Sequence, residues 1–334
     1  MSGKIVLAHG GGGRLTRELV KSLFLPPLAN DCLNELADAA VLPPVSGHLA
    51  FTTDAFVVDP PIFPGGDLGY LSVCGTVNDL AMVGAKPLAL SWALILEEGA
   101  EEGFLRTVVE GAARACREAG VSIVAGDTKV VPRGKGDRAF VTTAGVGAVQ
   151  GVPLSDRLVV PGDEVLVSGP VGDHGATVLA ARHGLGGELA SDVAPLWPLV
   201  ERLLASGVEV HALHDPTRGG VATVCYEVAE RTGLRVELEE TAIPVRPAVK
   251  AVMEVLGLDP LYVACEGRFL AFVAAGQGEK ALSVLREHPL GQQAQVVGAV
   301  RQRQSGEAPV VLRTAFGTLR PLDLLSGAEL PRIC

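Results

Sequence analysis

The chain has 334 residues, enough for two domains of ordinary size, and its 48% hydrophobic and 20% charged residues are typical of a compact globular protein. The net charge of -10 argues against a nucleic-acid partner held mainly through phosphate contacts, because such binding needs clustered Lys and Arg side chains. No charge-free apolar stretch reaches the roughly eighteen residues that a membrane span needs, so we expect a cytoplasmic protein.

The first half of the chain alternates predicted helices and strands. Leucines at helical spacing predict an amphipathic helix over residues 14–28. Further along the chain, the pattern predicts helices over 67–85 and 101–120 and strands over 49–58, 87–97, 121–131 and 138–151. Several of these strands are adjacent in sequence and can pair antiparallel, so we expect a mixed α/β domain.

A boundary is predicted near residues 159–175, where a strand ends in a glycine-rich turn. Beyond it, helices are predicted over 175–184, 219–233, 246–258 and 278–288, and strands over 234–240 and 267–275. From about Gly306 on, we expect short strand-like pieces over 308–316 and beyond, in an extended tail rather than a packed element. The predicted division is therefore an N-terminal domain over 1–155, a C-terminal α/β domain over 156–305, and an extended segment over 306–334 with a mobile tail that ends in Cys334.

A run of glycines lies near the start of the chain, in AHGGGGR at residues 8–14. Consecutive glycines can present several backbone N–H groups to an anion at the start of a helix. The run is not followed by the Lys-Ser or Lys-Thr of a P-loop. Gly10, Gly11, Gly12 and Gly13 therefore fit a flexible turn as well as a phosphate-binding loop.

Four aspartates stand beside small or turn-forming residues: Asp38, Asp54, Asp79 and Asp127. Any one of them can be a helix cap or a turn residue. Carboxylates at strand ends and helix starts also suit Mg²⁺, which commonly bridges acidic side chains to nucleotide phosphates. As a group, the four predict a site for Mg²⁺ and a nucleotide.

Three other residues are candidates for charge stabilisation or proton transfer. Lys129 follows Asp127 by two positions, so both side chains should lie on one side of a strand. His214 belongs to HDPTRGGV, which fits either an anion-binding turn or an ordinary connection from a strand to a helix. Glu266 interrupts an apolar strand, where an unpaired acid is costly unless it faces a cavity or a partner.

The six cysteines are spread singly, with no CxxC pair that would indicate a zinc site or a redox dithiol. Cys334 stands last, in ELPRIC, where it can neither fill a core nor close a short loop. It is either part of a frayed tail or a carrier that needs a flexible stalk.

The motifs together resemble a known family. HGGGGR, TTDAFVVDPPIFPGG, GTVNDLAMVGAKPL, AGDTKVVPRG, HDPTRGG, LGLDPLYVACEG and the final PRIC are similar to the family of the hydrogenase expression/formation protein E (HypE), the carbamoyl dehydratase of nickel-iron hydrogenase maturation. The resemblance implies a two-domain α/β (α+β) fold of the aminoimidazole ribonucleotide synthetase type. It also implies a homodimer whose N-terminal domains pair, with ATP near the interface.

The same resemblance implies the chemistry. The thiol of Cys334 would accept a carbamoyl group from a carbamoyltransferase of the HypF type, and ATP would be used to dehydrate it to a thiocyanate. An iron-carrying complex of the HypC-HypD type would then take the cyanide ligand. Mg²⁺ and the ATP phosphates would be held by Asp38, Asp54, Asp79 and Asp127. Lys129 and Glu266 are the candidates for charge stabilisation and proton removal, with His214 as a further candidate base.

The sequence departs from the family's pattern at two positions and leaves two rival functions to consider. An amide side chain and a lysine are expected where Cys265 and Arg268 stand, which puts the details of the pocket around Glu266 in doubt. One rival is a sister enzyme that phosphorylates a small molecule, which would have no use for a final cysteine. The other is a carrier or scaffold with a vestigial nucleotide site, against which the retained aspartates argue.

Overall fold

We analysed a computed structural model of the chain, which describes residues 3–11, 13–37, 39–185, 187–324 and 332–334. The N-terminal part is built on a four-stranded sheet in the order β1-β6-β4-β5. Its strands are β1 (Leu49–Phe56), β4 (Ala85–Glu97), β5 (Ser122–Val131) and β6 (Ala139–Val149). β6 pairs antiparallel with β1 and β4, whereas β4 and β5 are parallel.

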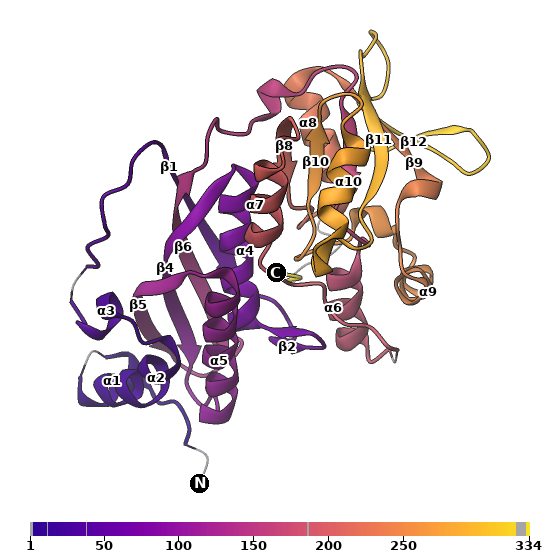
Figure 1. Cartoon of the computed structure of the whole chain (residues 1–334). Coiled ribbons are helices and arrows are strands. Elements are labelled where there is room, and N and C mark those ends of the chain that lie inside the picture. Colours follow the sequence, from indigo (N-terminus) through magenta and orange to yellow (C-terminus); the bar gives the residue numbers. More distant parts are fainter. Residues whose placement is uncertain (1–2, 12, 38, 186, 325–331) are drawn as a thin grey trace.

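Two helices, α4 (Leu68–Met82) and α5 (Glu102–Ala119), cover one face of this sheet (Figure 1). Asp67 caps α4 by accepting a hydrogen bond from the backbone N–H of Tyr70. The two helices pack closely because Gly69 has no side chain; a Cβ atom there would lie 1.7 Å from the carbonyl oxygen of Val108. α5 ends at Gly120, whose φ of 66° is the left-handed conformation that favours glycine.

Short elements complete the N-terminal part. Before the sheet come η1 (Leu7–Gly10), α1 (Arg14–Leu19), the π-helical turn η2 (Val20–Phe24), α2 (Leu25–Leu28) and α3 (Asp31–Asn34). β2 (Ile62–Phe63) and β3 (Gly66–Asp67) form a small hairpin-like ladder. The predicted helix over 14–28 is therefore confirmed as one helical stretch, with a π-helical turn in its middle.

The C-terminal part contains a seven-stranded sheet in the order β13-β12-β9-β11-β7-β10-β8. The strands are β7 (Glu164–Val167), β8 (Val210–His214), β9 (Arg235–Glu239), β10 (Leu270–Val273), β11 (Gln295–Arg301), β12 (Val310–Arg313) and β13 (Leu319–Pro321). The helices are α6 (Asp173–His183), α7 (Trp197–Ala205), α8 (Gly220–Thr232), α9 (Pro247–Leu256) and α10 (Gly278–Arg286), with short turns η3 (Asp156–Leu158), η4 (Glu240–Ala242), η5 (Pro260–Tyr262) and η6 (Pro289–Gly291). Because α7 packs against both α4 and α10, it joins the two parts.

The strand-like pieces predicted beyond Gly306 are present as β12 and β13, but the expectation that they stay unpacked is wrong for β12. β12 lies between β9 and β13, and the side chains of Val310, Leu312 and Leu322 are almost fully buried. The alternation of apolar residues in this stretch was too short to be distinguished from a tail. The first sheet ends at Val149 and the second begins at Glu164, so the predicted boundary at 155/156 falls between them and stays a prediction.

None of the described helices is long and apolar enough to cross a membrane.

Candidate functional site

The first group of acidic residues lies where β1 meets α4. Asp54 is on β1, and Asp79 is on α4, where its carboxylate accepts a 2.6 Å hydrogen bond from the hydroxyl of Thr52. Thr52 and Asp54 are two residues apart on one strand, so both face α4. Burial, and next the charge of Asp79, raise the pKa of Asp54 to about 6. Two predicted site residues therefore meet here.

A loop from the C-terminal part adds an acid and a cation to this group. Asp215 and Arg218 follow β8 in the HDPTRGG motif. The loop passes so close to the chain at 261–263 that a Cβ atom on Gly220 would lie 2.5 Å from the carbonyl oxygen of Leu261. Burial, and then the charges of Asp79 and Asp54, raise the pKa of Asp215 to about 7. The positive charge of Arg218 lowers the pKa values of Asp54 and Asp79 and so partly offsets the effect of burial.

Glu266 is the innermost acid of the cluster, and its backbone is held from both sides. The side-chain amide of Asn78 donates to the Glu266 carbonyl (3.2 Å), and the Asp192 carboxylate accepts from the Glu266 N–H (3.3 Å). The Glu266 side chain is 2% exposed, and its Oε1 has no hydrogen-bond partner among the described atoms. Burial, followed by the charge of Asp215, raises the pKa of Glu266 well above its usual range. An orphaned, buried carboxyl oxygen indicates that a ligand atom belongs beside it.

The two positions that depart from the family's pattern lie next to Glu266. The Cys265 sulfur accepts a hydrogen bond from the backbone N–H of Gly172 at 3.1 Å. The Arg268 guanidinium donates to the carbonyl of Pro170 and lies 3.8 Å from the Asp192 carboxylate. Both residues are buried and support the walls of the site rather than its acidic cluster.

We expect Asp215→Asn to stabilise the ligand-free protein at alkaline pH. The raised pKa of Asp215 means that the folded state holds a proton that the unfolded state has lost, so the free energy of unfolding falls as the pH rises from about 4 through about 7. Asn removes this loss, which for a pKa raised from 3.8 to about 7 is on the order of 4 kcal/mol at pH 8. Urea unfolding at pH 5 and pH 8 without nucleotide or metal measures it.

Asp127→Asn is the matched control. The hydrogen bond from Lys129 lowers the pKa of Asp127, so this variant should gain no stability at pH 8. If the free energy of unfolding of the Asp215→Asn protein depends on pH as that of the wild type does, the pKa of Asp215 is not raised in the folded protein.

The last three residues of the chain lie between the two parts and contact both of them (Figure 1). On the N-terminal side they run antiparallel to residues 57–59. The N–H of Val57 donates to the Cys334 oxygen (3.0 Å), and the N–H of Asp59 donates to the Arg332 carbonyl (3.2 Å). The Arg332 guanidinium donates to the Val57 carbonyl and pairs with Asp137 at 2.5 Å. The tail is thus added like a short strand.

On the C-terminal side, α6 supplies the remaining contacts. His174 Nε2 lies 2.9 Å from the carbonyl oxygen of Ile333, and the Arg182 guanidinium donates to the Arg332 carbonyl at 2.8 Å. The Ile333 side chain is 3% exposed and belongs to the main hydrophobic core. We call this set of contacts, made by residues 57–59, Asp137, His174 and Arg182, the tail seat. The seat binds mainly the backbone of the tail, and the Cys334 thiol is near enough to Glu266 and Asp54 for their charges to raise its pKa, after burial.

The free energy of seating is small enough for the tail to exchange between a seated and a released state. Its five hydrogen bonds are worth about 1 kcal/mol each, and burial of Ile333 adds about 2 kcal/mol. Ordering three residues costs about 1–2 kcal/mol each. Arg332 also has left-handed backbone (φ 58°), which costs a further ~1 kcal/mol. Seating is therefore favoured by only a few kcal/mol.

Cys334 ends within reach of the acidic cluster. Burial, and next the Glu266 carboxyl, raise the pKa of Cys334 to about 12, whereas Arg218 lowers it. The thiol therefore stays protonated and unreactive while it is seated. The structure brings together Cys334, Glu266, Asp54 and Asp79 from the predicted residues.

A second group of predicted residues lies on β5, at the opposite edge of the first sheet. Lys129 Nζ and the Asp127 carboxylate are 2.8 Å apart, which confirms that both side chains share one side of the strand. Gly10 packs on this strand so tightly that a Cβ atom would lie 2.3 Å from the backbone N of Val130. Gly11 follows it, and Gly13 is the N-cap of α1. The glycine run, Asp127 and Lys129 thus form one group.

The two groups do not meet within one chain. β1 and β5 are the two edge strands, three strand spacings or roughly 14 Å apart. In the described part of the chain, no three His, Cys, Asp or Glu side chains are arranged to hold a metal ion by themselves. Asp38 and Gly12 lie outside the described residues.

His214 contacts a carboxylate outside the group of predicted site residues. Its Nε2 lies 2.6 Å from the carboxylate of Asp156, which also pairs with Arg231. Among the residues that sequence reasoning missed are Asp215 and Arg218, although both stand in the motif from which His214 was chosen. The Asp-Pro turn could have indicated them, because a carboxylate that directly follows the end of a strand lies at the edge of the sheet where sites commonly form.

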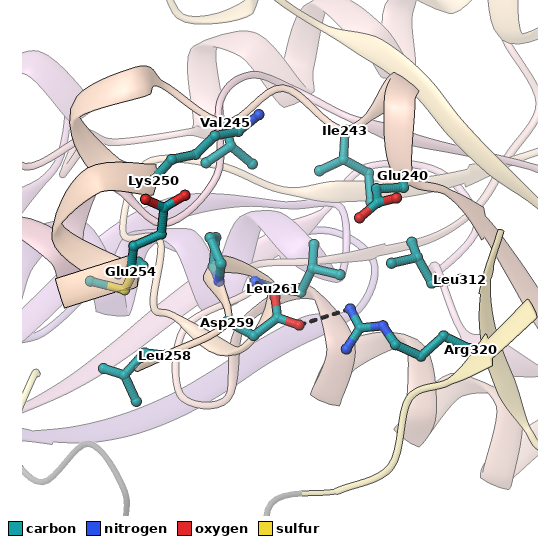
Figure 2. A pocket seen from close by; sticks show the side chains of 12 residues that line it. Glu240, Ile243, Val245, Lys250, Glu254, Leu258, Asp259, Leu261, Leu312 and Arg320 are labelled. Atoms are coloured by element: carbon teal, nitrogen blue, oxygen red, sulfur yellow. Dashed lines mark hydrogen bonds and ion pairs between the residues drawn. The ribbon is translucent and has the colours of Figure 1, made fainter. Parts of the chain in front are cut away.

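Two cavities lie apart from the acidic cluster. One, of about 300 Å³, lies between α9, η5 and β12 in the C-terminal part and has an apolar floor that includes Met253 and Leu261. Figure 2 shows charged side chains around it, including the ion pair of Asp259 with Arg320 (2.8 Å), and none of its lining residues is a predicted site residue. The other, of about 290 Å³, is enclosed by the N-terminal helices and by Trp92, and it reaches Asp127.

Comparisons with known proteins agree with this architecture. The family model described as AIR synthase related protein, N-terminal domain, matches residues 36–149, and the corresponding C-terminal domain matches 160–311. The carbamoyl dehydratase HypE of Cupriavidus necator is 48% identical over 337 residues, which cover 100% of this chain and 95% of that protein.

Solved structures give the same result. A crystal structure of the hydrogenase maturation protein HypE in complex with ATP matches with a TM-score of 0.94 and 45% identity, over 98% of this chain and 99% of that one. HypE in a HypE-HypF complex matches with a TM-score of 0.80 and 42% identity, over 92% and 99% of the two chains. The chain therefore belongs to the HypE family, and its two domains are those of the AIR synthase related proteins.

Proposed function

We propose that this protein uses ATP to dehydrate a carbamoyl group on the Cys334 sulfur to a thiocyanate, which supplies the cyanide ligand for the iron of nickel-iron hydrogenase. The observation that carries the proposal is the seated tail, which brings a thiol so near to the buried, orphaned carboxyl group of Glu266 that this group helps to raise the pKa of the thiol, after burial. Relatives of this chain are named carbamoyl dehydratase, and one relative was crystallised with ATP.

The acidic cluster fits Mg²⁺ and a triphosphate. Burial raises the pKa values of Asp54, Asp79 and Asp215, and the charge of Asp79 raises those of Asp54 and Asp215 further, which is the response of buried carboxylates that lack a cation among them. Oxygen ligands of this kind suit Mg²⁺. Asp127 and Asp38 would complete the set, and the glycine run would offer N–H groups to a phosphate. The apolar cavity beside Asp127 has room for the adenine base.

The chain's own residues account for the proton transfer. Bound Mg-ATP would supply the phosphoryl group that turns the amide oxygen into a good leaving group. The tail seat holds the carbamoyl sulfur, and Glu266 takes a proton from the amide nitrogen as the C≡N bond forms. Burial raises the pKa of Glu266 most, and the charges of the neighbouring acids raise it further. Cations among those acids would remove the second effect, so Glu266 would become a better base when the nucleotide site is filled.

Lys129 is the proposed cation for the developing charge on the phosphate, and it must come from a second copy of the chain. It lies at the opposite edge of the sheet from Glu266's neighbour Asp54, so one chain alone cannot bring the two groups together. Asp127 is placed in the same way. We therefore propose a homodimer in which each site takes one group from each chain.

A second copy also explains the uncovered face of the first sheet. Leu49 and Phe51 of β1 are 61% and 71% exposed on the face that α4 and α5 leave open, and Ile95 of β4 lies on it as well. Large apolar side chains at a sheet face and at two unpaired edges are a liability that a partner sheet removes. Two copies closing into one barrel would cover this face and both edges.

Mixed dimers test the shared site. A heterodimer of a Glu266→Gln chain and an Asp127→Asn chain, purified through two different tags, has one site with both defects and one site with none. It should therefore show about half of the wild-type dehydration rate, although each homodimer is nearly inactive. The rate is measured in a single turnover on carbamoylated protein.

The matched control places both substitutions in the same chain of a heterodimer with a wild-type chain. That dimer has one defect in each site and should be nearly inactive. If the first heterodimer is inactive and the control keeps half of the rate, each site is built within one chain.

The partners follow from the chemistry of the tail. A HypF-type carbamoyltransferase is the proposed donor, since a relative of this chain was crystallised in a HypE-HypF complex. A HypC-HypD-type complex that carries iron is the proposed acceptor. All six cysteines are free thiols, which suits a carrier that works in the reducing cytoplasm.

A further inference from the structure

The imidazole of His174 connects the tail to the interior of the protein. A carbonyl oxygen only accepts hydrogen bonds, so the proton must be on Nε2, which donates to Ile333. Burial lowers the pKa of His174, so the ring is neutral and Nδ1 is an acceptor. Ser191 Oγ, 2.8 Å away, therefore donates to Nδ1 and in turn accepts from the N–H of Val193. This chain of bonds fixes both the tautomer and the orientation of the ring.

The same loop also holds Glu266. Asp192, next to Ser191, accepts from the backbone N–H groups of Glu266 and Gly267, each at 3.3 Å. The contact is close, since a Cβ atom on Gly267 would lie 1.7 Å from the Asp192 carbonyl oxygen. The Ser191–Asp192 dipeptide therefore supports both His174, which holds the tail, and Glu266, which lies near the thiol of the tail.

We propose that His174 is a positioning residue that sets the register of the seated tail, so that the Ser191–Asp192 dipeptide aligns Cys334 with Glu266. The inference about docking stands on the contacts alone, and its consequence for dehydration rests on the proposed function. Arg182 fixes the preceding carbonyl of the tail, at Arg332, from the same helix. Arg332 and Asp137 are more exposed, at 35% and 55% of their side chains, so their ion pair contributes less.

The proposal predicts opposite effects on two steps. Loss of the His174 bond shifts the tail toward the released state, in which the thiol can reach an external reagent or a donor protein. The same loss removes the alignment that dehydration needs. A residue that only stabilises the fold would not speed one step and slow the other.

Alkylation of Cys334 tests docking without any activity assay. The full-length protein carries Cys32→Ser, which removes the other half-buried thiol. Iodoacetamide labelling of the C-terminal peptide is followed by mass spectrometry in the His174→Ala, Ser191→Ala and His174→Gln proteins. We expect His174→Ala to raise the labelling rate about tenfold, Ser191→Ala to raise it less, and His174→Gln to restore part of the protection, because its amide can still donate.

His183→Ala is the matched control, an exposed histidine on the same helix, and it should label at the wild-type rate. Melting temperatures identify any variant that has lost its fold. In that case Ser191→Ala, which removes a single oxygen atom, decides the matter. Equal labelling of folded Ser191→Ala or His174→Ala protein and wild type would overturn the proposal.

Dehydration of protein that was carbamoylated beforehand gives the second readout. His174→Ala should lower the single-turnover rate about tenfold at saturating ATP and leave the Kd for Mg-ATP unchanged. Faster labelling with an unchanged dehydration rate would overturn the alignment of Cys334 with Glu266. If wild-type protein itself shows no dehydration, the proposed function fails, whereas the labelling contrast still decides whether His174 holds the tail.

Discussion

Replacement of Cys334 by Ala should abolish both the carbamoyl and the cyano adducts of the chain. The Cys334 thiol lies within the electrostatic influence of Glu266 and Asp54, whereas the contacts of the seat are made by the backbone and by the side chains of Arg332 and Ile333. Mg-ATP binding and thermal stability should stay near wild type, because the methyl group of Ala keeps these contacts. Mass spectrometry of the C-terminal peptide measures the adducts, and calorimetry measures Mg-ATP binding and thermal stability.

Cys32→Ala is the control for this variant. Cys32 is the other half-buried free thiol, and it lies beside the N-terminal helices rather than at the acidic cluster. Its replacement should leave both adducts intact. If the Cys334→Ala chain still gains a carbamoyl group and loses water from it, another residue is the carrier, and the role of the seated tail has to be abandoned.

The second large effect is expected for Glu266→Gln. Gln keeps the shape of the side chain and its backbone bonds to Asn78 and Asp192, but it cannot take up a proton. A positioned base contributes about 10²–10⁴-fold, so dehydration should slow by that factor while carbamoylation of Cys334 continues. The carbamoylated chain should therefore accumulate, as single-turnover mass spectrometry can follow.

Glu209→Gln serves as its control, since Glu209 directly precedes β8 and its side chain is 66% exposed. It should convert at the wild-type rate. A Glu266→Gln protein that converts at that same rate would move the base elsewhere. Lys129 would be the next candidate, and His214 the weaker one, because Asp156 holds its Nε2.

Local pattern was sufficient to predict much of the fold. The helices at 68–82 and 102–119 and the strand at 85–97 are long, with strong patterns, and they were predicted almost to the residue. α7, β8 and β11 were not predicted, because apolar runs of this length fit a buried strand and a buried helix equally well.

The site was predictable only in part. The aspartates could be identified from their small and turn-forming neighbours, and Asp54 and Asp79 do meet, although Asp79 lies in the last turn of α4 rather than at a helix start. Asp127 could not be assigned to a different edge of the sheet, since strand order depends on pairing between distant segments. The seat residues His174 and Arg182 carry no motif, because they bind backbone carbonyls of a segment more than a hundred residues away.

The central claim is that ATP activates the amide oxygen of the carbamoyl group on Cys334. In a balanced reaction, the carbamoyl thioester and ATP give the thiocyanate, ADP, inorganic phosphate and a proton, and the amide oxygen leaves as part of the phosphate. Protein carbamoylated with an oxygen-18 label should therefore transfer the label to inorganic phosphate, one label for each thiocyanate formed, in a single turnover followed by mass spectrometry. Label that appears in water instead, with unlabelled phosphate, would contradict the account.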